Sequence, residues 1–224
     1  FLELLTIGMV IVAFCVVSGF RSNIGDTETY MFSYQALVSN PNIQFDRDLG
    51  FNALSRVLTH ISANPQILIL VTATIIAACN LTTLARYRKY GYYELQIYLY
   101  VTTGYFVTTM NGIRQALSAA VLFAFTNFVI KGKFIAYVIV VLILSTFHQS
   151  ALALITIYFV VGEEAWSKRM IQFMVIALVG IICYQVISPL IFKALANTTY
   201  GQYGSSTEGG SSLMRTIVNA VPVV

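Results

Sequence analysis

Three short polar clusters interrupt a chain that is otherwise strongly apolar, and each cluster holds a side chain that can do chemistry. Hydrophobic residues make up 58% of the 224 residues, and charged residues make up only 10%. An ionisable group in so apolar a setting is costly and is usually kept for function. The clusters are Arg21-Ser22-Asn23-Ile24-Gly25-Asp26, Asn111-Gly112-Ile113-Arg114-Gln115 and His148-Gln149-Ser150.

Arg114 stands at the start of an apolar run, where a charge is unexpected. If a helix begins near Gly112, Asn111 is a candidate N-cap and Arg114 lies in the first turn, beside free backbone N–H groups. A cation there opposes the helix dipole, at a cost of about 0.3–1 kcal/mol. Two positive elements in one place are best explained by a bound anion such as phosphate or diphosphate. The alternative is an arginine that extends to lipid head groups.

The first cluster follows the first apolar run and contains both a cation and a carboxylate. Gly25 permits a tight turn, which can direct Asp26 back to the mouth of the membrane. Asp26 can then accept a proton from a hydroxyl, Arg21 can bind a phosphate, and Tyr30 is four residues further on. The structural alternative is a capped turn with a local ion pair between Arg21 and Asp26.

His148 interrupts another apolar region. At an outer turn it can donate to a phosphate or a sugar hydroxyl, or act as an acid or base near neutral pH. The alternative is a hydrogen-bonded histidine of the core. Metal binding is not expected, because the chain has only one other histidine, His60, and no cysteine is near. We also expect no cofactor, since no Gly-rich nucleotide loop or paired-carboxylate metal site is evident.

The elements that must position these clusters are apolar helices. A hydrocarbon core of about 30 Å requires roughly 20 residues of helix. The candidate spans are 1–19, 66–85, 94–110, 113–130, 134–147, 150–162, 171–192 and 213–224. The sequence therefore predicts an all-α polytopic integral membrane protein with about eight transmembrane helices, in a single domain over 1–224. Both ends of the chain lie inside apolar runs, so we expect a fragment of a longer protein.

Orientation follows from the basic residues near the ends of the spans. Three basic clusters fall on one face if the spans alternate, and we interpret that face as cytoplasmic. The clusters are Arg86 with Arg88 and Lys89, Lys131 with Lys133, and Lys168 with Arg169. This interpretation depends on 134–162, which is either one helix of about 43 Å or two short helices folded back at 147–150. We favour the hairpin, because it keeps Lys168 and Arg169 on the cytoplasmic face, as the positive-inside rule requires. Only under this topology do all three polar clusters meet on the outer face.

Two segments outside the spans are expected on the outer side. The first is the loop 20–65, which contains an amphipathic helix over 49–63. Its apolar stripe consists of Phe51, Leu54, Leu58 and Ile61, and Arg56 lies away from that stripe. Asp46 or Asp48 can serve its first turn. The second is 193–212, whose Gly and Ser content predicts a flexible loop, either a flap over a site or a plain connection.

The order of the motifs resembles that of a known family. From about 20 to 155 the chain is similar to EpsG-type exopolysaccharide proteins, which belong with the Wzy-like O-antigen and capsule polymerases. Asp48-Leu49 stands where that family more often has Glu-Pro. The matching segments are Arg21 to Thr27 followed by Tyr30, Asp48 to Leu54, Gly112 to Leu117, and Phe147 to Ala151.

The resemblance implies a glycosyltransferase that joins oligosaccharide repeat units carried on polyprenyl diphosphate, in the inner (plasma) membrane, with its active site on the extracytoplasmic side. Arg114 and Arg21 would neutralise the diphosphate. Asp26 or His148 would deprotonate the acceptor hydroxyl. Tyr30 and Gln115 would orient sugars, and Arg56 is a further candidate for substrate binding. The implied partners are the lipid-linked oligosaccharide, membrane lipid, a flippase and a chain-length regulator, without nucleic acid or metal.

Three other functions are compatible with the same residues. A transporter or flippase of a lipid-linked sugar or an anion can also use arginines at a helix start. A ligase shares the chemistry and differs in its acceptor. A non-catalytic scaffold of a polysaccharide assembly would use the arginines only to bind anionic lipid, and the length of the polymer would then not depend on Arg114.

Overall fold

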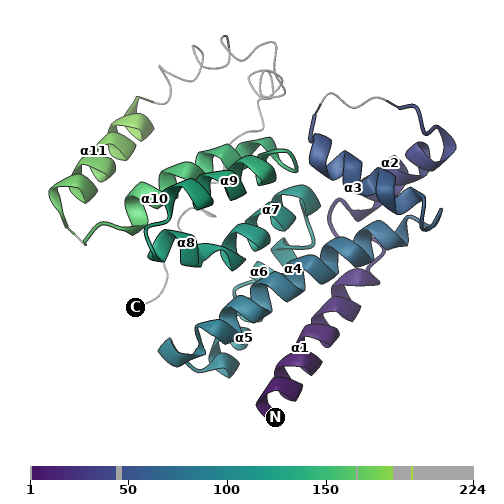
Figure 1. The fold of residues 1–224 in the computed structure, drawn as a ribbon, viewed down its shortest axis with the longest axis horizontal. Coiled ribbons are helices and arrows are strands. Elements are labelled where there is room, and N and C mark those ends of the chain that lie inside the picture. The colour runs from purple at the N-terminus through teal and green to yellow at the C-terminus, as the bar shows by residue number, and fades with distance from the viewer. Residues whose placement is uncertain (1, 44–46, 165, 184–192, 194–224) are drawn as a thin grey trace. The chain divides into compact units, whose positions relative to one another are not determined.

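The computed structural model describes residues 2–43, 47–164, 166–183 and 193. Within these residues all regular structure is helical, which confirms the predicted all-α class (Figure 1). The helices are α1 (Leu2–Gly19), α2 (Thr27–Ser39), α3 (Leu49–Thr59), α4 (Gln66–Arg86), η1 (Arg88–Tyr90), α5 (Tyr93–Thr102), α6 (Tyr105–Thr108), α7 (Ile113–Ala124), α8 (Thr126–Ile130), α9 (Phe134–Ser145), η2 (Gln149–Leu154), α10 (Ile155–Val161) and α11 (Lys168–Ile182). The expected span 213–224 lies outside the described residues, as does the expected loop 193–212 except Lys193.

The chain divides into two compact units, 1–162 and 163–224, and each is described by itself. All the candidate site residues fall in the first unit. In the second, the Ser167 hydroxyl accepts a hydrogen bond of 3.2 Å from the Met170 N–H at the start of α11. Arg169 forms an ion pair of 3.0 Å with Glu163 in the preceding turn.

Helix α4 is the central element of the first unit. It has 21 residues and a mean hydropathy of 2.2 over its most apolar window, and it is the one described helix long and apolar enough to cross a membrane. Four shorter apolar helices accompany it: Leu5–Gly19, Ile113–Ala124, Phe134–Ser145 and Gln149–Val161. The predicted span 94–110 is broken at Thr103-Gly104 into α5 and α6.

Helices α1 and α7 pack against α4 (Figure 1). Helix α7 runs in the same direction as α4, because Leu68 near the start of α4 shares a core cluster with Ile113. At the other end, Arg86 donates a hydrogen bond of 3.0 Å to the Ala124 carbonyl. The basic residues after α4 therefore lie at the end of this helix pair opposite to Arg114.

Residues 134–162 form the hairpin that the sequence analysis favoured. The Phe134 ring lies 4.9 Å from the Tyr158 ring, between their centroids, and the Tyr137 hydroxyl donates to the Leu154 carbonyl at 2.6 Å. The start of α9 is thus beside the end of the returning arm, and the chain reverses between Ser145 and Gln149. This reversal brings the turn to the end of the unit where α7 begins.

Helices α2 and α3 cover that same end, within the predicted loop 20–65. Helix α2 was not predicted, although Tyr30, Tyr34 and Leu37 form a buried stripe at helical spacing. Helix α3 starts where the amphipathic helix was expected and ends at Thr59, before the expected end at 63. Its apolar face is held against α2, where the Tyr30 and Phe51 rings meet edge to face at 5.6 Å.

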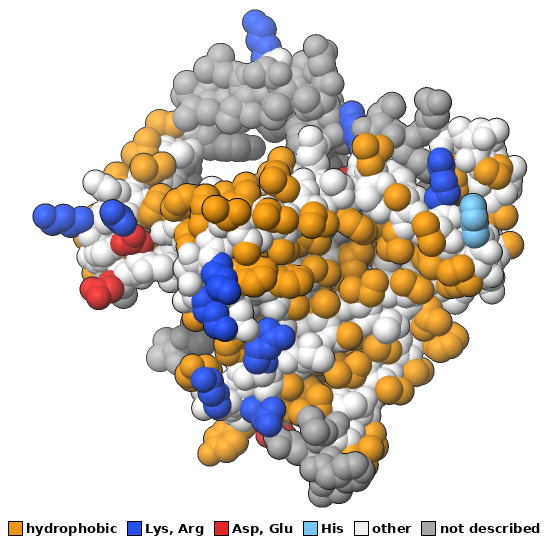
Figure 2. Space-filling model, in the orientation of Figure 1, with side chains coloured by type: hydrophobic (Ala, Val, Ile, Leu, Met, Phe, Trp, Pro, Cys, Tyr) orange, Lys and Arg blue, Asp and Glu red, His pale blue; other side chains and the backbone are white. Residues whose placement is uncertain are grey.

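The outward surface of these helices is strongly apolar. On α9 the exposed side chains belong to Phe134, Ile135, Ile139, Leu142 and Ile143, of which the last four recur at helical spacing. Figure 2 shows how hydrophobic side chains dominate the face in view. Apolar patches of this extent are rare on soluble monomers, and a lipid environment accounts for them.

Candidate functional site

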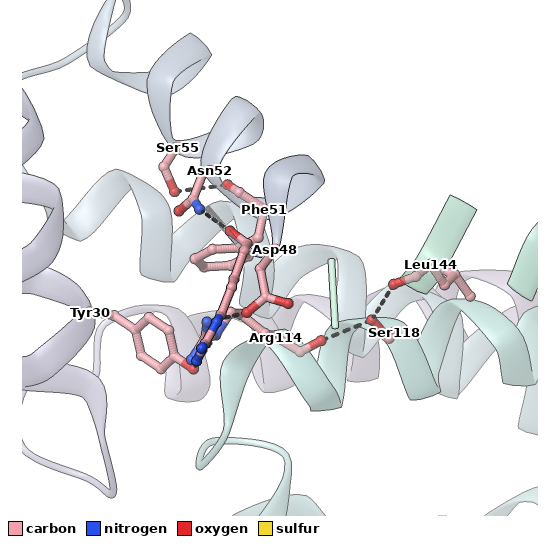
Figure 3. Close-up of polar contacts among 9 residues, drawn as sticks. Tyr30, Asp48, Phe51, Asn52, Ser55, Arg114, Ser118 and Leu144 are labelled. Atoms are coloured by element: carbon pink, nitrogen blue, oxygen red, sulfur yellow. Dashed lines mark hydrogen bonds and ion pairs between the residues drawn. The ribbon is translucent and has the colours of Figure 1, made fainter. Parts of the chain in front are cut away.

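Arg114, in the first turn of α7, is the centre of a cluster of polar contacts (Figure 3). Its Nε donates to the Tyr30 hydroxyl at 3.3 Å, and its guanidinium carbon lies 5.7 Å from the centre of the Tyr30 ring. Its Nη1 forms an ion pair with the Asp48 carboxylate. The Arg114 side chain keeps 41% of its surface exposed, whereas that of Asp48 keeps 12%. The guanidinium is therefore partnered by the protein and still open on one side.

The first free N–H of α7 is also occupied by a carboxylate. Both Asp26 oxygens accept from the Gly112 backbone N–H, at 3.0 and 3.1 Å. Gly112 is the N-cap residue, and not Asn111 as the sequence analysis expected. A carboxylate at a helix N-terminus is stabilised by the helix dipole. The chain itself thus supplies two anions, Asp26 and Asp48, where the sequence analysis placed the anion of a substrate.

Two close backbone approaches position these carboxylates. Gly25 has φ +60, and a Cβ there would lie 2.7 Å from the Asn111 Oδ1, so the turn before Asp26 fits against α7 only with glycine. The Gly50 N–H donates to the Thr146 carbonyl at 2.8 Å. A Cβ at Gly50 would lie 2.9 Å from the Phe147 ring, so the start of α3 also requires glycine to reach the hairpin turn.

His148 lies at the reversal of the hairpin, half-buried and with an extended backbone. Burial is the main cause that lowers its pKa from 6.5, and the positive charge of Arg114 lowers it further. The negative charge of Asp48 acts in the opposite direction. The hydroxyl of Ser118 bonds to the carbonyls of both Arg114 and Leu144, at 3.0 and 3.4 Å, and so ties α7 to the end of α9 (Figure 3). The lowered pKa of His148 favours its neutral imidazole, and the charges of Arg114 and Asp48 both act on it.

A family model of the EpsG family matches residues 4–224. The chain belongs to the EpsG family. This membership confirms the resemblance read from the motifs, and it assigns the chain a role in exopolysaccharide biosynthesis. Together with the apolar helices it indicates a membrane protein. No curated protein and no solved structure matched the chain.

The other candidate residues of the EpsG chain have surroundings that differ from those of Arg114. Arg21 is 6% exposed and donates to the Thr27 hydroxyl at 2.9 Å and to the Ser18 carbonyl at 2.6 Å. Arg56 is exposed in the last turn of α3 and donates to the Ile43 carbonyl at 2.7 Å. Gln115 is exposed and lines a cavity of about 190 Å³ with Asn111, Gly112 and part of α6. The structure therefore brings together Asp26, Tyr30, Arg114 and His148 at one end of the helices, whereas Arg21 is buried and bonded to residues close to it in the chain.

Asp48 is the member of this EpsG cluster that the sequence analysis did not include. It was expected to serve the first turn of α3, and it is the N-cap residue of that helix. Its side chain forms no capping hydrogen bond, and its backbone adopts the left-handed region with φ +49. The available signal was the acidic residue itself. Asp48-Leu49 stands where the family more often has Glu-Pro, and the first residue is acidic in both.

Proposed function

We propose that this EpsG chain polymerises oligosaccharide repeat units that are carried on polyprenyl diphosphate. The growing glycan is transferred to a hydroxyl of the incoming lipid-linked unit. The bond from the anomeric carbon to the diphosphate oxygen breaks, a bond to the acceptor oxygen forms, and the acceptor proton passes to a base. The observation that carries the proposal is the cluster itself: one half-exposed arginine at a helix start, with two carboxylates and with His148, whose pKa is lowered.

Arg114 is proposed to stabilise the departing diphosphate. Negative charge grows on the leaving oxygens as the bond breaks, and a fixed guanidinium that faces them lowers the barrier. The exposed part of the Arg114 side chain leaves room for this contact. The start of α7 adds a positive dipole, although Asp26 already occupies the Gly112 N–H.

His148 is proposed as the base that accepts the proton of the acceptor hydroxyl. Its lowered pKa keeps the imidazole neutral near pH 7, which is the form that can accept a proton. Asp26 is the weaker candidate, because both of its oxygens already accept from Gly112. Its contact instead supports a positioning role for the start of α7.

The remaining residues are assigned by their exposure. Gln115 lines the cavity beside α6 and is proposed to contact the sugar, and Tyr30 holds the Arg114 guanidinium. Arg56 is exposed near the surface of α3, where a long lipid-linked glycan can reach it. Arg21 is buried, and its contacts support a role in the turn before α2 rather than in phosphate binding.

The proposed topology has about eight transmembrane segments in the plasma membrane, with the Arg114 cluster on the extracytoplasmic side. Supporting it, the basic residues that follow α4 lie at the end of α4 opposite to the cluster, as the positive-inside rule requires. A flippase that delivers the repeat unit and a regulator of chain length are the partners that such a polymerase needs.

The test is chain extension in vitro, with the full-length protein and its own organism's repeat unit on polyprenyl diphosphate. Wild type is compared with Arg114→Ala, with His148→Ala and with the control Arg169→Ala, whose ion pair with Glu163 lies in the second unit. We expect a ladder of products from wild type and from the control. We expect none from Arg114→Ala or His148→Ala, with unfolding temperatures near that of wild type.

A folded wild type that makes no ladder would reject the polymerase. If the same preparation moved the lipid-linked unit across vesicle membranes, the protein would be a transporter. If Arg114→Ala made a normal ladder, the polymerase activity would be supported, but the proposed role of Arg114 in the active site would be rejected.

A further inference from the structure

Asp48 is held in an unusual way for a residue at the start of a helix. An aspartate at the N-cap normally accepts a hydrogen bond from a backbone N–H in the first turn. Here the side chain forms no such bond, the backbone is left-handed, and the carboxylate reaches Arg114 instead. A non-glycine residue in this region carries a conformational cost that the surrounding structure must offset, and such residues gather at functional sites.

The ion pair that results is suited to exchange. Its arginine is 41% exposed, so water, salt and a substrate anion can reach the guanidinium, whereas the Asp48 side chain is only 12% exposed. A diphosphate carries more negative charge than a carboxylate and offers several oxygens to the planar guanidinium. The Tyr30 hydroxyl holds the Nε of Arg114, so the guanidinium can stay in place while one partner replaces the other.

We propose that the diphosphate of the lipid-linked substrate displaces Asp48 from Arg114, and that the released carboxylate then supports His148 as it accepts a proton. This inference rests on the proposed function, and it makes Asp48 a positioning residue that acts through Arg114 and His148. Before substrate binds, the charge of Asp48 is neutralised by Arg114. After exchange, Arg114 is neutralised by the diphosphate, and Asp48 is left as an unpaired anion.

The consequence for His148 follows from the signs of the charges. The Gly50 N–H donates to the Thr146 carbonyl at 2.8 Å, so the start of α3, where Asp48 lies, packs against the turn that holds His148. Asp48 and Arg114 act on the imidazole in opposite directions. When diphosphate takes the guanidinium, the positive influence is cancelled and the negative one remains. An imidazole beside an unpaired carboxylate holds a proton more firmly. The base is therefore weakest in the empty enzyme and strongest once the leaving group is bound.

The experiment separates binding from turnover, using full-length protein in detergent or nanodiscs and farnesyl diphosphate as the binding probe. Asp48→Asn removes the competing charge and keeps the side-chain shape. We expect it to bind farnesyl diphosphate about fivefold more tightly, equivalent to about 1 kcal/mol. We expect its kcat for chain extension to fall by about tenfold or more, because general-base catalysis typically contributes at least that much to a rate. Asp48→Glu should restore much of both values, and farnesol should show no difference between variants.

Weaker or unchanged binding of farnesyl diphosphate to folded Asp48→Asn would overturn the exchange. Tighter binding with an unchanged kcat would overturn the catalytic half, since the released carboxylate would then do nothing. If wild type made no ladder while Asp48→Asn still bound the probe more tightly, the proposed polymerase would fail and the exchange itself would stand.

Hydrogen exchange on wild type provides a second measurement that needs no variant. Binding of farnesyl diphosphate should slow amide exchange at the start of α7 and accelerate it at the start of α3, where the released Asp48 no longer holds the helix end. Slower exchange in both segments would contradict the displacement.

Discussion

Arg21 and Arg114 lie at the same end of the helices and have opposite surroundings. Arg21 is 6% exposed and donates to a backbone carbonyl and a hydroxyl within seven residues of itself. The Arg114 side chain is 41% exposed, and its partners Tyr30 and Asp48 come from two other helices. From the sequence, both arginines were predicted to bind an anion. The difference shows that an arginine with local, buried partners fixes a turn, whereas one with distant, displaceable partners can bind a substrate.

The comparison is tested most strongly by removing Arg114. Arg114→Ala should lower kcat for chain extension about 10²–10³-fold, because the leaving diphosphate loses its fixed cation. The unfolding temperature should fall only modestly, because the Arg114 side chain is 41% exposed, and the part of the loss that remains comes from Asp48, which is 12% exposed and loses its partner. Product ladders and thermal unfolding on one preparation measure both. Unfolding of the variant at the assay temperature would show that Arg114, like Arg21, is needed for the fold.

Removing Arg21 should give the opposite result. Arg21→Ala leaves the buried Ser18 carbonyl and Thr27 hydroxyl without this donor, at a cost of about 1–3 kcal/mol in the free energy of unfolding. The protein that stays folded should retain the wild-type kcat. A thermal shift assay beside single-turnover extension separates the two effects. A stable Arg21→Ala that extends no glycan would end the distinction between the two arginines.

An effect on stability of similar size is expected where backbones meet around Arg114. In Gly50→Ala the added methyl meets the Phe147 ring, so the start of α3 and the hairpin turn must separate. Such overpacking costs about 1–3 kcal/mol. We expect a lower unfolding temperature together with reduced turnover, because Asp48 and His148 flank this contact. Gly8→Ala is the matched control, since no atom lies near its added methyl.

The smallest effect concerns the protonation of His148. Its folded pKa is lowered below 6.5, so the unfolded chain binds more protons in the range below that value. The free energy of unfolding should therefore fall as pH drops below about 6.5. In His60→Gln, His148 is the one remaining histidine, and NMR of its imidazole follows the titration directly. A His148 titration midpoint above pH 6.5 would contradict the proposal that His148 is a neutral base.

Some of the helices and turns could be predicted from the sequence, and others could not, for physical reasons. Apolar runs report burial in lipid, so α4 was predicted to within one residue of its observed end, and the reversal near His148 followed from the charges of the flanking segments. Helix α2 was missed because its stripe consists largely of tyrosines within a polar segment. The break at Gly104 was missed because Thr102 and Thr103 before it carry no charge and apolar residues follow it.

Contacts between distant segments lie beyond such patterns. Arg114 and Asp48 are 66 residues apart, and Gly112 and Asp26 are 86 residues apart. The sequence analysis predicted that the clusters of Asp26, Arg114 and His148 meet on one face, but it did not include Asp48 and did not indicate which carboxylate meets which donor. That depends on Gly25 and Gly50, whose lack of side chains is meaningful only once the facing residues are known.

The short arms of the hairpin have a further consequence under the proposed topology. Helix α9 has 12 residues and is about 18 Å long, well short of a hydrocarbon thickness of about 30 Å. A turn carried by such arms sits below the plane of the lipid head groups, or the bilayer thins around it. A carrier lipid can then diffuse laterally to His148 while its diphosphate stays at the polar boundary. Bilayer thickness becomes a variable of the reaction, and lipids of different chain length should alter the rate without any change in the protein.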